Sequence, residues 1–254
     1  MRFTMKDSPE KMIENDENAE LLTITLPDGS KHKLEKGKQI IELAKQLPTA
    51  EGLPFICARV NNDILSLDFA PEMDCNIEFL NYKSPHGRDC YRRSLTFVLA
   101  RAIMELYRNA RLAIDHSIGN GYYYDLFTDV PVSEQILAYI KTKMLEIIDK
   151  NEPFGKKTMT RTEAIALFNR EGYPEKARLL KNLNTDKVGI VSCWKYIDLD
   201  FGAMVPSAGY LKTFDLKQYA QGFVLLFPEH EDPTTPAQIR RQPKIFQAYR
   251  ETKN

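Results

Sequence analysis

The N-terminal part of the chain places apolar residues in short runs typical of β-strands. From Leu21 the sequence reads LLTITL, then PDGS, then KHKLE, which predicts two strands joined by a tight turn at Pro27 and Gly29. The order of these and the next elements predicts a small ubiquitin-like roll over residues 20–82. A helix and three further strands are expected at residues 38–47, 56–60, 64–67 and 76–80.

The pattern changes after a short stretch with Pro85 and Gly87, which predicts a linker over residues 83–89. Apolar residues then recur at helical spacing, so one face of a helix is expected in the core. These core positions are Leu95, Val98, Leu99, Ala102, Ile103 and Leu106. Ser133 is a candidate N-cap for a long helix, and Thr160 with Glu163 forms a capping-box signature. A short helix at 175–183 and strands at 112–114, 122–127, 189–194 and 222–227 complete a second α+β domain over residues 90–228.

The two ends of the chain carry a different composition. Residues 1–19 are polar and charged without periodicity, which predicts a disordered leader. Residues 229–254 begin as a Pro/Thr-rich stretch, so we expect a linker or helix towards a further C-terminal domain. The whole chain is therefore expected to belong to the α+β class.

Charge and cysteine content limit the classes of partner and compartment. The 35 basic and 35 acidic residues balance, so no net field attracts the protein to nucleic acid or to an anionic membrane. The four cysteines are scattered without a CxxC pair, which favours a reducing, cytoplasmic setting. No apolar run approaches the ~20 residues that span a bilayer, and the acidic N-terminus is unlike a targeting peptide, so no membrane partner is expected.

Three motifs resemble the editing domain of threonyl-tRNA synthetase: RRSLTFVLARA (92–102), HSIGNGYYYD (116–125) and YIDLDFGAMVPSAG (196–209). In that family a HxxxH pair on the first helix and a CxxxH pair on the later loop converge on a hydrolytic, zinc-capable centre. The corresponding positions here are Arg93, Phe97, Asp200 and Met204. Only Asp200 has a side chain that ligates zinc readily, whereas a hydrolytic zinc needs about three protein ligands. The resemblance thus implies that the framework is kept while its chemistry has been removed.

The first eighty residues resemble another part of the same synthetases. The segments ITLPDGS, ARVNND and CNIEFL look like the TGS domain that precedes the editing domain. The implied fold is a small ubiquitin-like β-grasp (TGS) domain followed by a larger α+β domain of the threonyl/alanyl-tRNA synthetase second-additional-domain type. The TGS fold serves as an interaction module in several contexts, and a plain packing role is the alternative.

A second resemblance covers about residues 20–228. Certain bacterial uridine kinase-like (nucleoside kinase) proteins share RRSLTFVLARA, HSIGNGYYY and FGAMVPSAGYLKTFDLKQYAQGFVLLFP with this chain. They carry a TGS domain and a degenerate editing-like domain in front of an ATP-binding P-loop kinase domain. The implied partner is such a C-terminal kinase domain. The chain has no GxxxxGK[ST] motif, so the phosphate transfer of the parent protein is not expected within it.

We expect a partly polar cleft where the three motifs meet. Aromatic faces there can stack on a base, and an arginine with nearby acids can bind a ribose or phosphate of a nucleoside, a nucleotide or RNA. The alternative interpretation is structural: the tyrosines face the core and Arg93 pairs with Asp198 or Asp200. The candidate residues are Arg93, Phe97, His116, Tyr122, Tyr124, Asp125, Asp198, Asp200 and Met204.

Two functional hypotheses follow. The first is a non-catalytic binding or regulatory module of a uridine (nucleoside) kinase-like protein, with no catalytic residue, metal or cofactor of its own. The second is a threonyl-tRNA synthetase-like editing hydrolase acting on mischarged tRNA, in which Asp198, Asp200 or a substrate hydroxyl replaces the lost ligands. Catalysis of this kind needs a matched acid and base or a metal, which the residues do not supply, so the first hypothesis is favoured.

Overall fold

A computed structural model describes residues 20–129 and 131–239, and the predicted leader and most of the predicted C-terminal extension lie outside this range. The N-terminal part is a five-stranded sheet in the order β2-β1-β5-β3-β4. Its strands are β1 (Leu21–Thr25), β2 (Lys31–Glu35), β3 (Cys57–Val60), β4 (Asp63–Leu65) and β5 (Cys75–Leu80). The β1 and β2 strands form the predicted hairpin, and β1 pairs in parallel with β5, as in the predicted roll.

The helix over this sheet, α1 (Ile41–Ala44), is much shorter than the expected 38–47. Its first amides are used elsewhere: the Ile40 and Ile41 N–H groups donate to the Phe69 and Leu67 carbonyls, both at 2.9 Å. The segment after β4 thereby fixes where the helix begins. A one-turn 3₁₀ helix, η1 (Ala50–Gly52), follows before β3.

The long helix α2 (Pro85–Leu106) starts inside the stretch expected to be a linker. Ser84 caps it by accepting a hydrogen bond from the Gly87 amide at 2.9 Å, and Pro85 occupies the first turn, where its missing N–H costs nothing. The expected core face is buried except for Leu106, which is 36% exposed because the helix ends there.

One side of α2 packs against a four-stranded antiparallel sheet in the order β11-β12-β7-β6. The strands are β6 (Arg111–Ser117), β7 (Gly121–Phe127), β11 (Asp215–Tyr219) and β12 (Gly222–Leu226). The second long helix, α3 (Glu134–Lys150), packs against α2 and β11 and has Ser133 as its N-cap, as predicted. A 3₁₀ turn, η2 (Ala208–Tyr210), lies against α3.

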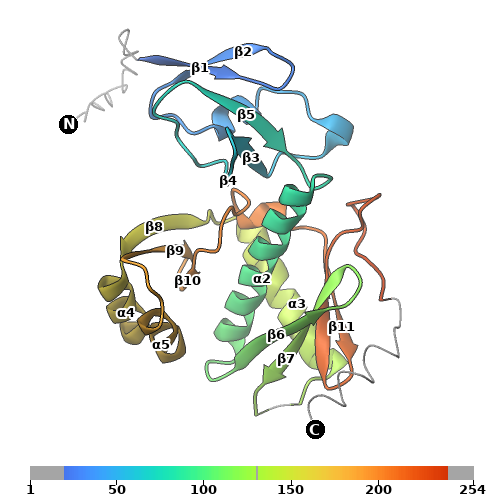
Figure 1. Cartoon of the computed structure of the whole chain (residues 1–254). Coiled ribbons are helices and arrows are strands. Elements are labelled where there is room, and N and C mark those ends of the chain that lie inside the picture. Colours follow the sequence, from blue (N-terminus) through green and yellow to red (C-terminus); the bar gives the residue numbers. More distant parts are fainter. Residues whose placement is uncertain (1–19, 130, 240–254) are drawn as a thin grey trace, which may run out of the picture.

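The other side of α2 faces a smaller lobe (Figure 1). It contains a three-stranded antiparallel sheet in the order β10-β9-β8, covered by two helices. The predicted capping box of Thr160 and Glu163 is present at the start of α4. The elements are β8 (Gly155–Thr160), α4 (Arg161–Arg170), α5 (Pro174–Lys181), β9 (Lys187–Cys193) and β10 (Tyr196–Leu199).

Helix α2 is thus the central element, and the N-terminal sheet sits above it (Figure 1). The largest buried cluster includes Ile56, Leu80 and Tyr82 of the N-terminal part together with the inward face of α2. The expected α+β class is confirmed. Within the described residues, every helix is too short or too polar to cross a bilayer.

Candidate functional site

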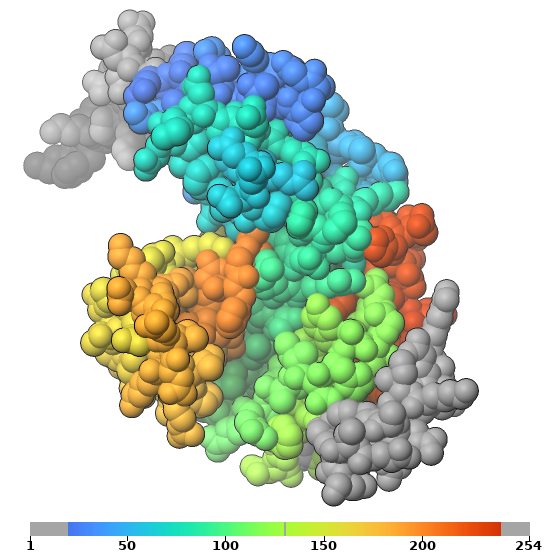
Figure 2. All heavy atoms as spheres, in the orientation of Figure 1, coloured from blue at the N-terminus to red at the C-terminus, as the bar shows by residue number. Residues whose placement is uncertain are grey.

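A cleft of about 410 Å³ opens between the smaller lobe and the four-stranded sheet, with α2 as its floor. Figure 2 shows the molecule hollowed between these two lobes. Five of the predicted residues line this cleft: Arg93, Phe97, Tyr122, Asp198 and Met204. The three motifs therefore do converge in space. The other lining residues are Asp89, Arg92, Thr96, Ala100, Ile114, Val191, Leu199 and Phe201.

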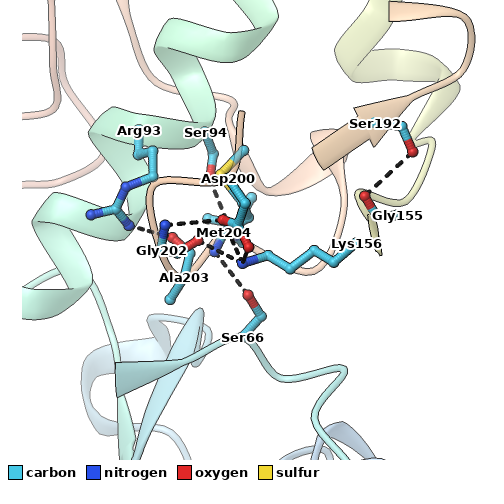
Figure 3. A network of polar contacts seen from close by, with 11 residues as sticks. Ser66, Arg93, Ser94, Gly155, Lys156, Ser192, Asp200, Gly202, Ala203 and Met204 are labelled. Atoms are coloured by element: carbon cyan, nitrogen blue, oxygen red, sulfur yellow. Dashed lines mark hydrogen bonds and ion pairs between the residues drawn. The ribbon is translucent and has the colours of Figure 1, made fainter. Parts of the chain in front are cut away.

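Arg93 reaches across from α2 to the loop that follows β10 (Figure 3). Its Nη1 donates to the Ala203 carbonyl at 2.5 Å. The guanidinium lies against Gly202, where an added Cβ would stand 3.3 Å from Arg93 Cζ. Gly202 has a φ of 128°, a conformation that favours glycine, so the close approach and the backbone both select this residue.

The proposed salt bridge between Arg93 and Asp198 or Asp200 is wrong, because lysines satisfy both carboxylates. Asp200 pairs with Lys156, whose Nζ lies 3.0 and 2.9 Å from its two oxygens and also donates to the Gly202 carbonyl at 2.6 Å. Asp198, which lies in β10 and not in the loop, pairs with Lys176 at 2.9 Å.

Lys176 is held by more than its carboxylate partner. Its Nζ lies 4.6 Å from the ring centroid of Tyr173 and 5.0 Å from that of Tyr196. The Tyr196 hydroxyl donates to Asp198 at 3.2 Å. Burial beside this carboxylate keeps the pKa of Tyr196 well above its ordinary value, so the phenol stays protonated and able to donate.

Two buried serines fix the loop after Asp200 (Figure 3). Ser94 Oγ on α2 accepts from the Val205 amide at 2.9 Å, and Ser66 Oγ in the N-terminal part accepts from the Met204 amide at 2.8 Å. Ser94 Oγ donates to the Cys90 carbonyl at 2.8 Å, and Met204 Sδ lies 3.7 Å from the same oxygen. Sequence reasoning missed both serines and Lys156; Ser94 lies inside RRSLTFVLARA, but Ser66 and Lys156 lie outside every motif.

Phe97 on α2 places an aromatic ring where the resembled family has a metal ligand. It is 5% exposed and makes edge contacts with the rings of Phe154 and Tyr196, whose centroids lie 5.5 and 4.9 Å away. Such contacts are the usual arrangement of aromatic pairs in a core. Phe97 thus contributes packing on one side and an apolar wall to the cleft on the other.

The donor set at this centre does not fit a hydrolytic zinc ion. Arg93 is a permanent cation, Phe97 offers no ligand atom, and the thioether of Met204 is a soft donor that is 1% exposed and contacts Ser94. Asp200 is the remaining ligand type, and its oxygens are occupied by Lys156. In residues 20–129 and 131–239 no group of three or more His, Cys, Asp or Glu side chains is placed to hold a metal ion.

The other predicted residues lie away from the cleft. Tyr124 is fully buried, its hydroxyl is 2.9 Å from Thr96 Oγ1, and its ring stacks on Phe223. Burial raises the pKa of Tyr124, as expected for a core phenol. His116 contacts Asp115 at 2.7 Å, and Asp125 accepts from the Tyr123 hydroxyl at 3.0 Å. Asp200 faces a neighbouring cavity.

The cleft contains several groups that the sequence did not single out. Arg92 donates to the Asn120 side chain at 2.7 Å, and its Nε is buried without a hydrogen-bond partner among the described residues. Phe201 and Ile114 belong to opposite lobes and are 69% and 55% exposed. Phe201 and Arg92 lie within the three motifs, so their place in a motif could have identified them as site residues. Ile114 lies outside the motifs, and nothing in the sequence pointed to it.

Comparison with known proteins gives one consistent result. The chain is 32% identical over 204 residues to the threonine–tRNA ligase of Janthinobacterium sp. (strain Marseille). It is 32% identical over 206 residues to that of Desulforamulus reducens and 31% identical over 204 residues to that of Rickettsia canadensis. No protein-family model matches the chain.

Each of these alignments covers 80% of this chain but only 32% of the ligase. The chain therefore spans about a third of the length of the curated relatives it matches. The similarity supports a threonyl-tRNA synthetase-like domain over most of the chain.

Proposed function

We propose that this chain is a binding module built on an editing-type domain that does not hydrolyse aminoacyl esters. The observation that supports this most strongly is the state of the loop after β10. Arg93 holds its Ala203 carbonyl and Lys156 holds its Asp200 carboxylate. Two of the positions that correspond to metal ligands in the resembled family, Arg93 and Asp200, thus form contacts that hold this loop in place.

Hydrolysis needs a group that activates water, and the cleft offers poor candidates. Asp198 in the cleft and Asp200 in the neighbouring cavity are each paired with a lysine at 2.9 Å. Both carboxylates are therefore engaged by ammonium groups of the protein and are not free to accept a proton from water. No histidine lines the cleft within the described residues.

Binding, in contrast, is well supported by the shape and lining of the cleft. Its volume of about 410 Å³ lies within the usual range of ~300–1,000 Å³ for small-molecule sites. The ring of Phe201 offers an exposed stacking face, and Arg92 and Arg93 supply positive charge. These groups match a nucleoside, a nucleotide or an exposed end of an RNA.

Titration with uridine, uridine nucleotides and tRNA tests this function. We expect saturable binding of at least one of them, weakened about tenfold (~1.4 kcal/mol) or more in Arg93→Ala. Arg170→Ala is the matched control, because Arg170 is 72% exposed on α4. No binding by the chain, or equal affinity in Arg93→Ala, contradicts the proposed role of the cleft.

The editing hydrolase is the second candidate, and the comparisons favour it over a kinase module. The relatives are named threonine–tRNA ligases, and the cleft keeps two carboxylates on its wall, of which Asp198 lies in a motif that resembles the editing domain. For hydrolysis, this candidate would need a substrate hydroxyl held near Asp198 in place of the lost metal ligands. Release of amino acid from mischarged tRNA, lost in Asp198→Asn, is the outcome that selects this candidate.

The partnership with a P-loop kinase domain rests on the sequence resemblance alone and stays a prediction. Its measurement is the mass of the native gene product in its own cell extract. A species near twice 29.3 kDa or above that phosphorylates uridine supports the partnership. A species at 29.3 kDa without a bound kinase contradicts it.

A further inference from the structure

The guanidinium of Arg93 carries a charge that no acidic side chain of residues 20–129 and 131–239 neutralises. Arg93 is half-buried, lines the cleft, and donates its hydrogen bond to the uncharged Ala203 carbonyl. The two aspartates that were expected to pair with it, Asp198 and Asp200, are each paired with a lysine at 2.9 Å. Because a partly buried charge is costly without a counter-ion, this cation favours an anionic ligand.

One edge of the Arg93 guanidinium is fixed by the protein and the opposite edge is free. Nη1 is directed at the Ala203 carbonyl, and Figure 3 shows the other terminal nitrogen directed away from the loop. Within the described residues, neither Nε nor Nη2 of Arg93 has a hydrogen-bond partner. These two nitrogens form a planar fork that can donate two parallel hydrogen bonds to the oxygens of a phosphate group.

The neighbouring Arg92 does not add a second uncompensated charge to the cleft. Its Nη1 lies 3.6 Å from the Asp89 carboxylate, which also lines the cleft, and its Nη2 donates to the Asn120 side chain. The remaining charged side chain of the lining, Asp198, has its own lysine partner. Among the described residues, the charges that line the cleft therefore cancel except for that of Arg93.

We propose that the cleft binds a nucleoside monophosphate, with its phosphate on the free edge of Arg93. This inference rests on the proposed function and names the class of ligand. The face of α2 that lines the cleft is charged at Asp89 and Arg93 and becomes apolar at Phe97 and Ala100. Arg93 and Ala100 are about 10 Å apart along the helix axis. A nucleoside monophosphate has the same polarity, with its charge at one end and its ring at the other.

The number of phosphate groups follows from the charge of the cleft. A nucleoside has no anionic group and leaves Arg93 uncompensated. A second or third phosphate adds negative charge that meets no free cation among the described lining residues, and the Asp89 and Asp198 carboxylates repel it. The monophosphate is therefore expected to bind more tightly than the nucleoside, the diphosphate and the triphosphate.

Calorimetric titration of the full chain without divalent cations tests this order. The probes are uridine, cytidine, adenosine and guanosine, each beside its 5′-mono-, di- and triphosphate. We expect at least one monophosphate to bind about tenfold or more tightly than its own nucleoside, and more tightly than its di- and triphosphate. Added NaCl should weaken the monophosphate more than the nucleoside, because only the former pairs with a charge. Inorganic phosphate should compete with the monophosphate.

The ratio of the two affinities isolates the contact between Arg93 and the phosphate. In Arg93→Ala the ratio is expected to fall to near one, whereas a mere displacement of the loop would weaken nucleoside and nucleotide alike. Arg93→Lys keeps the charge without the fork and should retain part of the ratio. Arg170→Ala on α4 is the matched control and should keep all of it. The salt dependence of the parent chain decides the question when Arg93→Ala does not fold.

A monophosphate that binds no tighter than its nucleoside, or a ratio that Arg93→Ala leaves unchanged, overturns the phosphate contact. The proposed function still stands in that case, provided that a nucleoside or tRNA binds and that Arg93→Ala weakens it. Tighter binding of a di- or triphosphate overturns the preference for one phosphate group. Absence of binding by nucleosides, nucleotides and tRNA overturns both this inference and the proposed function.

Discussion

At the scale of single residues, the chain stabilises its most buried cation by surrounding it with fixed partners. This cation is Arg101 on α2, with a side chain only 1% exposed. It pairs with Glu105 at 2.8 Å and with Glu152 at 2.7 Å, and its Nη1 also reaches Cys193 Sγ at 3.0 Å. This arrangement ties α2 to the segments before β8 and at the end of β9.

Replacement of Arg101 by methionine is expected to lower the free energy of unfolding by about 3 kcal/mol, because two carboxylates lose their buried partner. This loss of stability is near the lower end of the range for breaking buried ion pairs, because Glu105 and Glu152 are about a quarter exposed. Urea denaturation measures it. Arg170→Met, which removes an exposed ion pair to Glu171, is the control and should change stability by less than about 0.5 kcal/mol.

The sequence predicted some of the residues that line the cleft but not the hydrogen bonds and ion pairs that they form. The sequence brought Arg93, Phe97 and Met204 together correctly. The predicted partners of Arg93 were wrong, because nothing in GKKTMT indicates that Lys156 reaches Asp200 across the intervening strand β9. Tyr124 and Tyr122 have the same parity along β7, yet only Tyr122 lines the cleft, since Thr96 and Phe223 cover the ring and hydroxyl of Tyr124.

At the scale of elements, capping residues and apolar spacing predicted three of the helices, whereas three strands were not predicted. The expected helix near 175–183 and the helices capped by Ser133 and Thr160 are present. The strand β8 is exposed at five of its six residues, so it lacks the apolar alternation that marks a strand. It forms because all six residues pair with β9. The strands β10 and β11 are short and were likewise not recognised.

The capping box of α4 offers a direct test of an element boundary. Thr160 Oγ1 accepts the Glu163 amide at 3.3 Å, and Glu163 accepts from the Thr160 amide at 2.8 Å. Thr160→Ala removes the side-chain oxygen, and we expect a loss of about 1 kcal/mol in the free energy of unfolding. Thr160→Ser keeps the oxygen and should retain most of the stability. Equal losses in the two variants would show that the methyl group, and not the cap, matters.

The contact between α3 and β11 predicts a pH dependence. Asp215 is hydrogen-bonded by Lys141 at 2.8 Å and by Lys217 at 3.0 Å. Burial raises the pKa of Asp215, but the two lysines outweigh this effect and hold the pKa below the ordinary value of 3.8. A depressed pKa in the folded state gives stability that is present above about pH 4 and is lost as the pH falls through the folded pKa.

Asp215→Asn should therefore be less stable than the parent at pH 7 and lose less stability on acidification below pH 4. Chemical denaturation of both proteins at a series of pH values provides the comparison. Parallel pH profiles for the two proteins would contradict the assignment of this acid dependence to Asp215.

At the scale of the whole molecule, the N-terminal sheet and α2 share a core. Ile56 is 2% exposed and lies in the same buried cluster as Leu95 and Val98. Sequence patterns identified both sets of apolar residues but not their contact, because the pattern of each element does not state which other element covers it. The predicted linker at 83–89 is wrong, since α2 begins at Pro85 and leaves no flexible spacer between the sheet and the helix.

This continuous core predicts coupled unfolding of the two parts. Ile56→Ala is expected to cost about 2–5 kcal/mol, as for other large-to-small core changes. Hydrogen exchange should show that protection falls in both β5 and α2. Ile64→Ala on the partly buried strand β4 is the milder control. A loss of protection confined to the N-terminal sheet would contradict the coupling.

The proposed module retains an editing-type framework but binds without hydrolysis. The most direct measurement is release of amino acid from mischarged tRNA by the purified chain, with and without added zinc, beside a threonine–tRNA ligase as positive control. We expect release at the rate of the enzyme-free blank in both conditions, together with no bound zinc by elemental analysis. Release that requires zinc, or that is abolished in Asp198→Asn, would show that the chain is a hydrolase and not a binding module.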